Sequence, residues 1–326
     1  MAVPQYVAYI GGAAASLITA LAIVKCRCVL APDVHKPDRR MIPKVGGLVA
    51  ISYLIVAFIL SRAWTNSYLT IFYTTPIITG LVGLIDDIYS VHEYIRVAVP
   101  AIYPAALMAA LRLYDGPLYF TMVGHFSNPI VVIMLVLLIY AIFSNAINMM
   151  DVVNGVVPYS MVLASIIPLA YAIMYGNGIV LQMSLALIIP SAILYAFNRY
   201  PARLFNGNSG AYALGALLAG LILFSHVGTL LMLLSTPYVV NGLLILLSSG
   251  GIKSRSRLRR STYMDEALRI HPNREPGSTI TLMKIMVWDR PMDEPEAIRG
   301  FMTLFNVTTS LSILLYIVLY LLRWIP

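Results

Sequence analysis

Residues 116–150 read GPLYFTMVGHFSNPIVVIMLVLLIYAIFSNAINMM and contain no aspartate, glutamate, lysine or arginine. A helix that crosses the hydrocarbon core of a bilayer needs about 20 mostly apolar residues. This stretch is therefore long enough for a membrane span. Seven other stretches also lack these four charged residue types: 1–24, 45–61, 63–85, 97–111, 152–198, 204–252 and 300–322.

Two of the stretches are too long for one helix, and turn residues divide them at Gly176-Asn177-Gly178 and at Ser225-His226-Val227-Gly228. The sequence thus predicts an all-α integral membrane protein with ten spans. We expect a single domain over residues 1–326, with a larger loop at 250–300. Part of that loop, residues 279–283, fits either a strand or an interfacial helix.

The composition supports a membrane protein and argues against other classes. The chain has 326 residues, of which 60% are hydrophobic and 11% are charged, whereas soluble domains have about 45–50% apolar and about 25% charged residues. The net charge of +8 does not indicate nucleic-acid binding, because the basic residues lie at the borders of the spans. Cys26 and Cys28 are too few for a disulfide scaffold, and we expect a structural or incidental role for them.

The charged residues also predict the orientation. Ten spans place 19 of the 22 lysines and arginines on one side of the membrane, and basic loops face the cytosol. Both termini then lie outside, and no positive charge precedes the first span, so it is an anchor and not a cleavable signal. Of the 14 acids, 13 also lie on the cytosolic side, which suggests chemistry on a charged, metal-bound substrate. The alternative is that polar residues simply gather in these loops.

Two motifs at the ends of spans carry possible ligands. Asp86 and Asp87 end the third span; two adjacent carboxylates at the membrane edge indicate a metal–diphosphate site or a general base, or else a solvated helix end. Asn145-Ala-Ile-Asn148-Met-Met-Asp151-Val-Val-Asn154-Gly155 follows the fifth span. These side chains form a cluster of oxygen ligands and amide donors, or they cap the helix end.

Three further motifs are typical of phosphate binding, although each has a simpler explanation. Asn206-Gly207-Asn208-Ser209-Gly210 opens the eighth span, where N–H groups at a helix start favour anions or form an ordinary cap. Lys253–Arg260 holds five cations, which grip phosphate or anionic lipid. The loop from Asp33 to Gly47 mixes acids, bases and glycines. All five motifs fall on the cytosolic face, as a site for a nucleoside diphosphate and a lipid phosphate requires.

With these motifs in order along nearly the whole chain, the sequence resembles the polyprenyl-phosphate N-acetylhexosamine-1-phosphate transferases. It is most similar to the eukaryotic and archaeal branch that makes N-acetylglucosaminyl-diphospho-dolichol. The resemblance rests on five segments: Asp33-Val-His35-Lys36, Asp86-Asp87, Asn145 to Gly155, Tyr200-Pro201-Ala202-Arg203-Leu204-Phe205, and Gly207. The ten-helix fold of that family agrees with the span count.

The resemblance implies a reaction and roles for named residues. A polyprenyl (dolichyl) phosphate attacks the β-phosphorus of a UDP-N-acetylhexosamine and releases UMP, with Mg²⁺, or Mn²⁺ in its place, on the diphosphate. The implied catalytic residues are Asp86, Asp87, Asp151 and Asn154; the implied metal ligands are Asn154 and Asn208; the implied substrate-binding residues are Lys36, Arg96, Asn148, Gly207, Arg257 and Arg259. The product would serve N-glycosylation.

The chain departs from the family pattern at three positions. Asn208 stands where the family has an aspartate, Arg96 where it has a lysine, and Leu258 where it has the histidine of an Arg-His-Arg triplet. An amide ligates Mg²⁺ without adding charge, so a degenerate paralogue that binds without turnover is an alternative, and a transporter is a more remote one. The absence of the bacterial His-rich motif from the last loop argues against a peptidoglycan precursor as substrate.

We further expect a bilayer-embedded protein of the archaeal plasma membrane, or of the endoplasmic reticulum if the source is eukaryotic. Its partners would be the UDP-sugar, the lipid phosphate and a second copy in a homodimer, with no nucleic acid.

Overall fold

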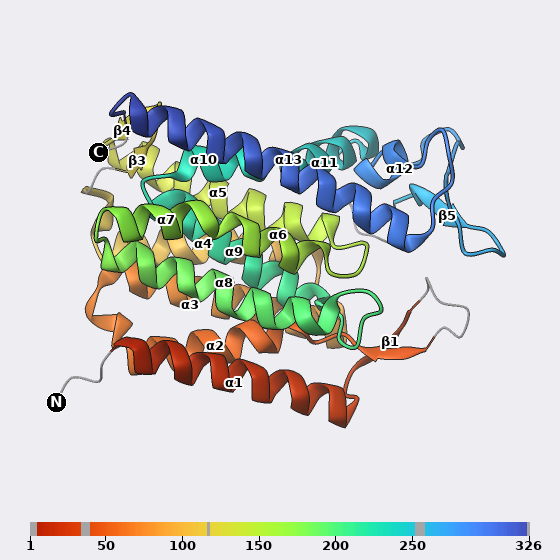
Figure 1. Cartoon of the computed structure of the whole chain (residues 1–326), viewed down its shortest axis with the longest axis horizontal. Coiled ribbons are helices and arrows are strands. Elements are labelled where there is room, and N and C mark those ends of the chain that lie inside the picture. Colours follow the sequence, from red (N-terminus) through yellow and green to blue (C-terminus); the bar gives the residue numbers. More distant parts are fainter. Residues whose placement is uncertain (1–4, 34–39, 116–117, 252–257, 325–326) are drawn as a thin grey trace.

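The computed structural model describes residues 5–33, 40–115, 118–251 and 258–324. Within these residues the chain is a bundle of long helices with three short antiparallel β-hairpins at its ends (Figure 1). It is an all-α integral membrane protein, as the sequence predicts. The helices are α1 (Gln5–Cys26), α2 (Gly47–Leu60), α3 (Ser67–Tyr89), α4 (Glu93–Ala110), α5 (Pro129–Met150), α6 (Val156–Ala164), α7 (Ile166–Met174), α8 (Gly178–Asn198), α9 (Gly207–Phe224), α10 (Gly228–Leu234), α11 (Thr236–Ser249), α12 (Leu282–Met286) and α13 (Glu294–Leu321).

Each hairpin pairs two strands of three residues. β1 (Leu30–Pro32) pairs with β2 (Met41–Pro43), β3 (Leu118–Phe120) with β4 (Gly124–Phe126), and β5 (Thr262–Met264) with β6 (Ile270–Pro272). The short 3₁₀ helices η1 (Ala63–Thr65) and η2 (Leu113–Asp115) complete the connections. Cys26, the last residue of α1, forms a disulfide with Cys28.

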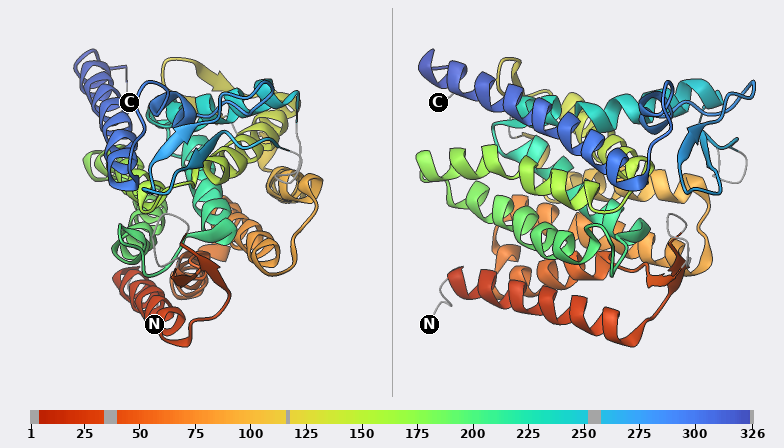
Figure 2. Two further views of the ribbon diagram at one scale, coloured as in Figure 1. Left: turned by 90° about the vertical axis from the view of Figure 1, so that its right-hand side faces the viewer. Right: turned by 45° about the vertical axis from the view of Figure 1, so that its right-hand side comes forward.

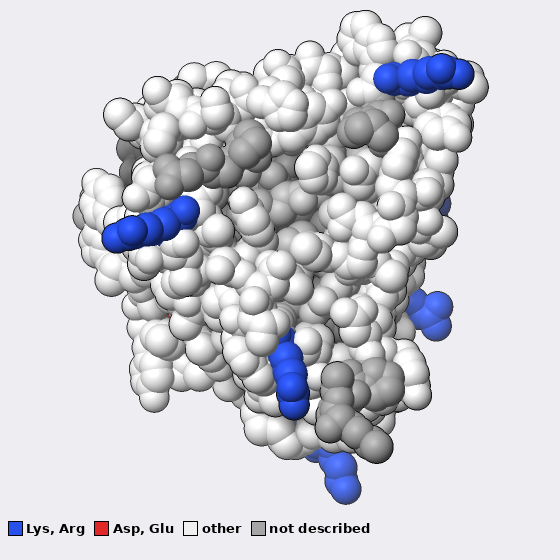
Figure 3. All heavy atoms as spheres, turned by 90° about the vertical axis from the view of Figure 1, so that its left-hand side faces the viewer, with Lys and Arg blue, Asp and Glu red and all other residues white. Residues whose placement is uncertain are grey.

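The two ends of the bundle differ. Both chain termini and the β3–β4 hairpin lie at one end, which we call the terminal end (Figure 1). The β1–β2 and β5–β6 hairpins and α12 lie at the other, which we call the loop end. Among the described residues, the face of the terminal end presents scattered basic side chains and almost no acidic ones (Figure 3). The near-absence of acids on this face agrees with the sequence, which assigns 13 of the 14 acids to the opposite side.

The predicted spans correspond to helices or helix pairs. Seven helical segments of the described chain are long and apolar enough to cross a membrane, and α10 with α11 forms a further segment bent by 61°. The apolar helix α2 has only 14 residues, and α4 has 18 residues but is not among the seven. The number of spans that cross the bilayer therefore stays a prediction.

The stretch 116–150 is not helical throughout, contrary to the simplest interpretation of its composition. Leu118–Phe120 and Gly124–Phe126 form a hairpin, and α5 begins only at Pro129, where the Asn128 side chain accepts hydrogen bonds from the backbone N–H groups of Ile130 and Val131. Apolarity alone cannot distinguish a short strand from a helix, whereas an asparagine followed by proline marks a helix start.

Two long stretches break as predicted at residues 176–178 and 225–228, and each also breaks once more. α6 ends at Ala164 and α7 starts at Ile166; α10 ends at Leu234 and α11 starts at Thr236. In both cases a proline, Pro168 or Pro237, follows within three residues. Proline has no N–H for the helical hydrogen bond to the preceding turn, so the helix is interrupted there, and α10 and α11 are bent by 61°.

Helix α9 lies at the centre of the bundle, as the end-on view in Figure 2 makes visible. It packs against α3, α5, α2 and α8, and every residue from 209 to 223 is buried. The outermost helices α1 and α13 instead expose large apolar side chains such as Ile18 and Leu314, which suits contact with lipid tails. The N-terminus of α9 thus reaches the loop end inside a ring of other helices.

Candidate functional site

The site is built around the N-terminal turn of α9, residues 206–210, where three backbone segments meet closely. Gly207 has a φ of +70°, and a Cβ there would collide with the carbonyl oxygen of Lys44. A Cβ on Gly83 of α3 would lie 2.6 Å from the carbonyl oxygen of Asn208, and one on Gly47 would overlap Ser209. Glycines are required here because the α2 and α3 backbones touch the turn directly.

Asp87, in the last turn of α3, caps α9 from the side. Its Oδ1 accepts a hydrogen bond from the Asn208 backbone N–H at 3.1 Å, and its Oδ2 accepts one from the Ser209 N–H at 3.0 Å. The side chain is 6% exposed. A carboxylate at a helix N-terminus is stabilised by the helix dipole and by these donors. Asp87 therefore supplies the acceptors that the first N–H groups of α9 would otherwise lack.

Asp86 faces a different set of donors. Its Oδ2 accepts hydrogen bonds from Nδ2 of Asn208 at 2.7 Å and from the Arg96 guanidinium at 3.1 Å. Its Oδ1 accepts one from the Val91 N–H at 2.6 Å. The Arg96 pair joins the end of α3 to the first turns of α4. Of the two adjacent acids, Asp87 thus caps a helix, whereas Asp86 forms an ion pair.

The polar cluster after α5 reaches the same turn. Nδ2 of Asn206 donates to Oδ2 of Asp151 at 3.2 Å, and Asp151 lies directly after the last residue of α5. Asn148, one turn earlier, donates to the hydroxyl of Tyr212 on α9 at 3.4 Å. Asn145 bonds back to the carbonyl of Ala141 in its own helix. Five of the predicted residues, Asp86, Asp87, Arg96, Asp151 and Asn208, therefore contact the 206–209 turn or each other.

Asn154 and Gly155 form a tight turn between α5 and α6. Gly155 has a φ of +81°, and its N–H donates to Oδ1 of Asn198 at 2.9 Å. The N–H of Asn154 donates to Oε1 of Glu294 at 3.3 Å. Asn154 is 7% exposed, and its Nδ2 atom has no hydrogen-bond partner among the described residues. The predicted ligand is therefore buried and its backbone is fixed from outside its own loop.

Sequence reasoning missed Asn198, Tyr212 and Glu294. Asn198 and Tyr212 lie within apolar stretches, where the sequence gives no sign of their partners. Glu294 belongs to an Asp-Glu-Pro-Glu segment that forms a capping box between Asp293 and Glu296 at the start of α13. That signal marks a helix start, but it does not reveal that Glu294 itself is 3% exposed.

The cationic loop residues are placed only in part. Lys36 and Arg257 lie outside the described residues. Arg259 donates to the carbonyl of Pro276 at 2.7 Å, and its own carbonyl accepts from Thr279. It is thus held within the loop that carries the β5–β6 hairpin, and among the residues that the structure describes no hydrogen bond or ion pair joins it to the α9 turn. Residues 279–281 are neither strand nor helix, and α12 follows them.

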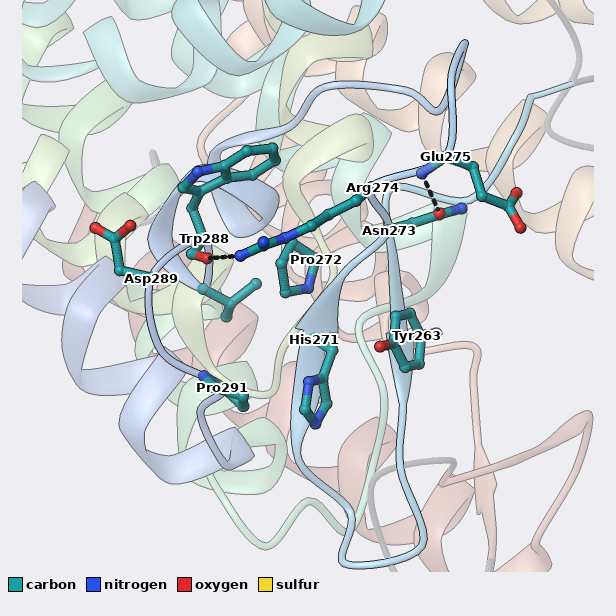
Figure 4. Close-up of a pocket in the computed structure, with 10 residues that line it drawn as sticks. Tyr263, His271, Pro272, Asn273, Arg274, Glu275, Trp288, Asp289 and Pro291 are labelled. Carbon is teal, nitrogen blue, oxygen red and sulfur yellow. Dashed lines mark hydrogen bonds between the residues drawn. The ribbon is translucent and has the colours of Figure 1, made fainter.

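A pocket of about 690 Å³ lies in this same loop. Tyr263 and His271 stack on neighbouring strands, and the Arg274 guanidinium lies 5.1 Å from the Trp288 ring and donates to the Trp288 carbonyl (Figure 4). None of the predicted site residues that the structure describes lines it. Beside it, the Arg269 N–H and the His271 ring, in that order, lower the pKa of Asp265. This pocket is separate from the α9 turn.

The residues around α9 fit a Mg²⁺ that arrives with a phosphate substrate. Within the described ranges, no cluster of three or more His, Cys, Asp or Glu residues could hold a metal alone. Mg²⁺ is usually bound by one or two carboxylates together with substrate phosphates, and not by a complete protein cage. The buried, unpartnered Oδ1 of Asn206 and the carboxylate of Asp151, which Nδ2 of Asn206 contacts, bring oxygen groups together at this turn. These groups fit a metal that the protein holds only in part.

Comparisons with known proteins find similar sequences over much of this chain. The model of glycosyl transferase family 4 matches residues 69–226, which run from α3 to the residues after α9 and include the whole turn. The predicted resemblance is confirmed over residues 69–226, which are similar to glycosyl transferase family 4.

Its relatives carry more specific names. A protein of Saccharolobus solfataricus named "Putative UDP-N-acetylglucosamine--dolichyl-phosphate N-acetylglucosaminephosphotransferase" is 29% identical over 257 residues, which cover 72% of this chain and 75% of the relative. A Sulfolobus acidocaldarius protein with the same name is 25% identical over 280 residues, or 81% and 82% of the two chains. A phospho-N-acetylmuramoyl-pentapeptide-transferase of Dictyoglomus turgidum is 26% identical over 208 residues, or 62% and 65%.

Proposed function

We propose that this protein transfers N-acetylhexosamine-1-phosphate from a UDP-sugar to a polyprenyl or dolichyl phosphate and releases UMP. N-acetylglucosamine-1-phosphate is the proposed group, and the product would begin a lipid-linked oligosaccharide for N-glycosylation. The observation that carries the proposal is the meeting of Asp86, Arg96 and Asp151 at the α9 turn, at the end of the bundle away from the termini. The relatives named for this reaction add support.

The chemistry is a single phosphoryl transfer. An oxygen of the lipid phosphate forms a bond to the β-phosphorus of the UDP-sugar, and the bond from that phosphorus to the bridging oxygen breaks, so that UMP leaves with the electron pair. Both reactants are anionic, and the protein mainly positions them and neutralises charge. Arg96 is the described cation closest to this role, because its guanidinium already lies against a site carboxylate.

We assign the two acids different parts in this reaction. Asp87 keeps the α9 turn in place through two backbone N–H groups. Asp86 holds Arg96 and Asn208 together and is the acid that can release Arg96 to the incoming diphosphate. Mg²⁺, held by Asn154 and Asn208 together with Asp151, would supply positive charge to the diphosphate. Asn148 and Gly207 would border the substrate, and Lys36, Arg257 and Arg259 would add cations from the loops.

The proposed orientation places the loop end in the cytosol. Of 22 lysines and arginines, 19 fall in the segments assigned to that side, and basic loops stay on the cytosolic side. UDP-sugars would then reach the α9 turn from the cytosol, and both termini would lie outside.

The test is an assay of two products with purified protein in detergent or liposomes. Labelled UDP-N-acetylglucosamine, dolichyl phosphate and Mg²⁺ should give UMP and a labelled lipid in equal amounts. Asp86→Asn should reduce both by at least tenfold, whereas Asp289→Asn, at an exposed acid of the last loop, should not. UDP-N-acetylmuramoyl-pentapeptide should be a poor donor. Absence of UMP release from any UDP-N-acetylhexosamine, at any Mg²⁺ or Mn²⁺ concentration, would overturn the proposal.

A further inference from the structure

A buried glutamate from the last helix contacts the loop that carries the proposed ligand Asn154. Glu294 is the first residue of α13, 140 positions away from Asn154 in sequence. Its side chain is 3% exposed, and its Oε1 accepts the Asn154 backbone N–H at 3.3 Å. Burial of a carboxylate is costly unless hydrogen bonds compensate it. The position of this acid therefore needs an explanation beyond helix capping, which Asp293 and Glu296 already provide.

The Asn154–Gly155 turn is clamped from two sides. Oδ1 of Asn198, at the end of α8, accepts the Gly155 N–H at 2.9 Å, and its Nδ2 donates to the Leu204 carbonyl. Glu294 holds the adjacent N–H from α13. The two consecutive N–H groups are thus bound by side chains from different helices. This arrangement fixes the peptide plane on each side of Asn154, and with it the direction of the Asn154 Cα–Cβ bond.

The helix that carries Glu294 is itself attached to the same region. Tyr159, one turn into α6, donates from its hydroxyl to Oδ1 of Asn306 on α13 at 2.7 Å. α13 and α6 are therefore joined at two levels, at the turn and about three helical turns further along α13. A displacement of the α13 start would move the acceptor of the Asn154 N–H.

We infer that Glu294 is a positioning residue for Asn154: its carboxylate holds the backbone of the Asn154–Gly155 turn so that the carboxamide reaches the metal-bound diphosphate. The inference rests on the proposed function. The start of α13 would then contribute to the site, although this helix lies far from the other site residues in the sequence. Outer hydrogen-bond partners of metal ligands generally change metal affinity by about 10–100-fold when they are lost.

The experiment compares three variants at the start of α13. Glu294→Ala removes the acceptor, Glu294→Gln keeps an acceptor oxygen and removes the charge, and Glu296→Ala perturbs the capping box without touching Asn154. Thermal unfolding of each purified variant shows which of them fold. Mn²⁺ binding in the presence of UDP, followed by electron paramagnetic resonance, gives a readout that is independent of turnover, and the Mg²⁺ dependence of UMP release gives a second one.

We expect Glu294→Ala to weaken Mn²⁺ binding and to raise the Mg²⁺ requirement by about tenfold. Glu294→Gln should stay within about threefold of the wild type, and Glu296→Ala should change the melting temperature only. Wild-type behaviour of Glu294→Ala, or equal loss in Glu294→Gln, would overturn the inference and leave the proposed function intact. A wild-type chain that neither binds Mn²⁺ with UDP nor releases UMP would overturn both.

Discussion

The side-chain amide of Asn208 donates a hydrogen bond of 2.7 Å to Oδ2 of Asp86. An aspartate at position 208 could not donate, and it would place a second carboxylate against the first. The amide therefore stabilises the site in the absence of a cation. The departure from the family motif thus has a local physical reason in this chain: the neutral residue balances an acid that the motif also requires.

Asn208→Asp should consequently make the protein depend on divalent cations for stability. Loss of a hydrogen bond to a charged group costs about 1.5–3 kcal/mol, and the like charges add repulsion. In EDTA we expect a lower melting temperature than for the wild type, with recovery at millimolar Mg²⁺. The same melting curve with and without Mg²⁺ would contradict this account. If UMP release also rises strongly in the variant, the natural asparagine limits turnover, as expected for an impaired paralogue.

Gly207→Ala should prevent correct packing of the α9 turn. The added methyl group would meet the Lys44 carbonyl oxygen and lie 2.8 Å from Oδ2 of Asp87, and the φ of +70° adds strain of about 1–2 kcal/mol. Gly176→Ala is the matched control, because Gly176 has a φ of +64° but nothing within 4 Å of the added atom. We expect Gly176→Ala to cost only the backbone strain, and Gly207→Ala to lose far more folded protein in detergent chromatography. Equal yields would contradict the packing argument.

Asp87→Asn should lower the free energy of unfolding even under conditions in which no substrate is present. An asparagine presents one acceptor and one donor to the N–H groups of Asn208 and Ser209, so one of them loses its partner. An unpaired buried donor costs about 1–3 kcal/mol. Thermal or denaturant unfolding in detergent measures the loss, and Asp289→Asn serves as the surface control. If Asp87→Asn abolished activity with unchanged stability, Asp87 would act on the substrate and not through the helix cap.

The β5–β6 loop should respond to acid through Asp265. The Arg269 N–H and the His271 ring lower the pKa of this carboxyl, so the charged form is favoured in the folded loop. Its contribution is complete above the usual aspartate pKa and is lost as the pH falls through the lowered value. With ¹⁵N-labelled arginine, the Arg269 amide resonance should titrate with a midpoint below 3.8, the unperturbed value. In Asp265→Asn this titration should vanish; a midpoint above 3.8 would contradict the predicted sign.

The proposed orientation predicts which introduced thiols are labelled from the cytosolic side. Ser90, beside the Asp86–Asp87 pair, and Thr65, at the opposite end of α3, are both exposed. In a chain with Cys26→Ser and Cys28→Ser, a thiol at Ser90→Cys should react with an impermeant maleimide only in inverted vesicles. A thiol at Thr65→Cys should react only in intact cells. The reverse pattern would place the α9 turn outside and contradict the use of a cytosolic nucleotide sugar.

The general architecture was predictable from the sequence. A helix that crosses the bilayer must be long and apolar, so charge-free stretches mark the spans, and turn residues mark the connections between them. The position of the Asp86–Asp87 pair in the last turn of α3 and the turn at Gly176–Gly178 both follow from local rules. The β3–β4 hairpin did not, since a short strand and a helix have the same apolar composition. The additional helix breaks lie just before Pro168 and Pro237. These prolines did not predict the breaks, because membrane helices often tolerate proline.

The sequence predicted which residues belong to the site better than it predicted the contacts between them. Asp86 and Asp87 look equivalent in sequence, and only the approach of α9 gives one of them two backbone donors and the other an arginine. Asn208 has an amide where the family pattern has a carboxylate. Its hydrogen-bond partner, Asp86, is 122 residues away in the sequence. Glu294 could not be found because its burial depends on the packing of α13 against α6. Long-range relationships of this kind leave no periodic signal in the chain.

The central position of α9 has a consequence for how the bilayer affects this protein. A helix buried along residues 209–223 meets no acyl chains and cannot tilt on its own to match a thicker or thinner membrane, as a lipid-facing helix can. Hydrophobic mismatch would be absorbed by the peripheral helices α1 and α13, while the residues at the tip of α9 keep their spacing. Membrane composition should then regulate how readily a long-chain substrate arrives at the turn, and leave the shape of the turn itself unchanged.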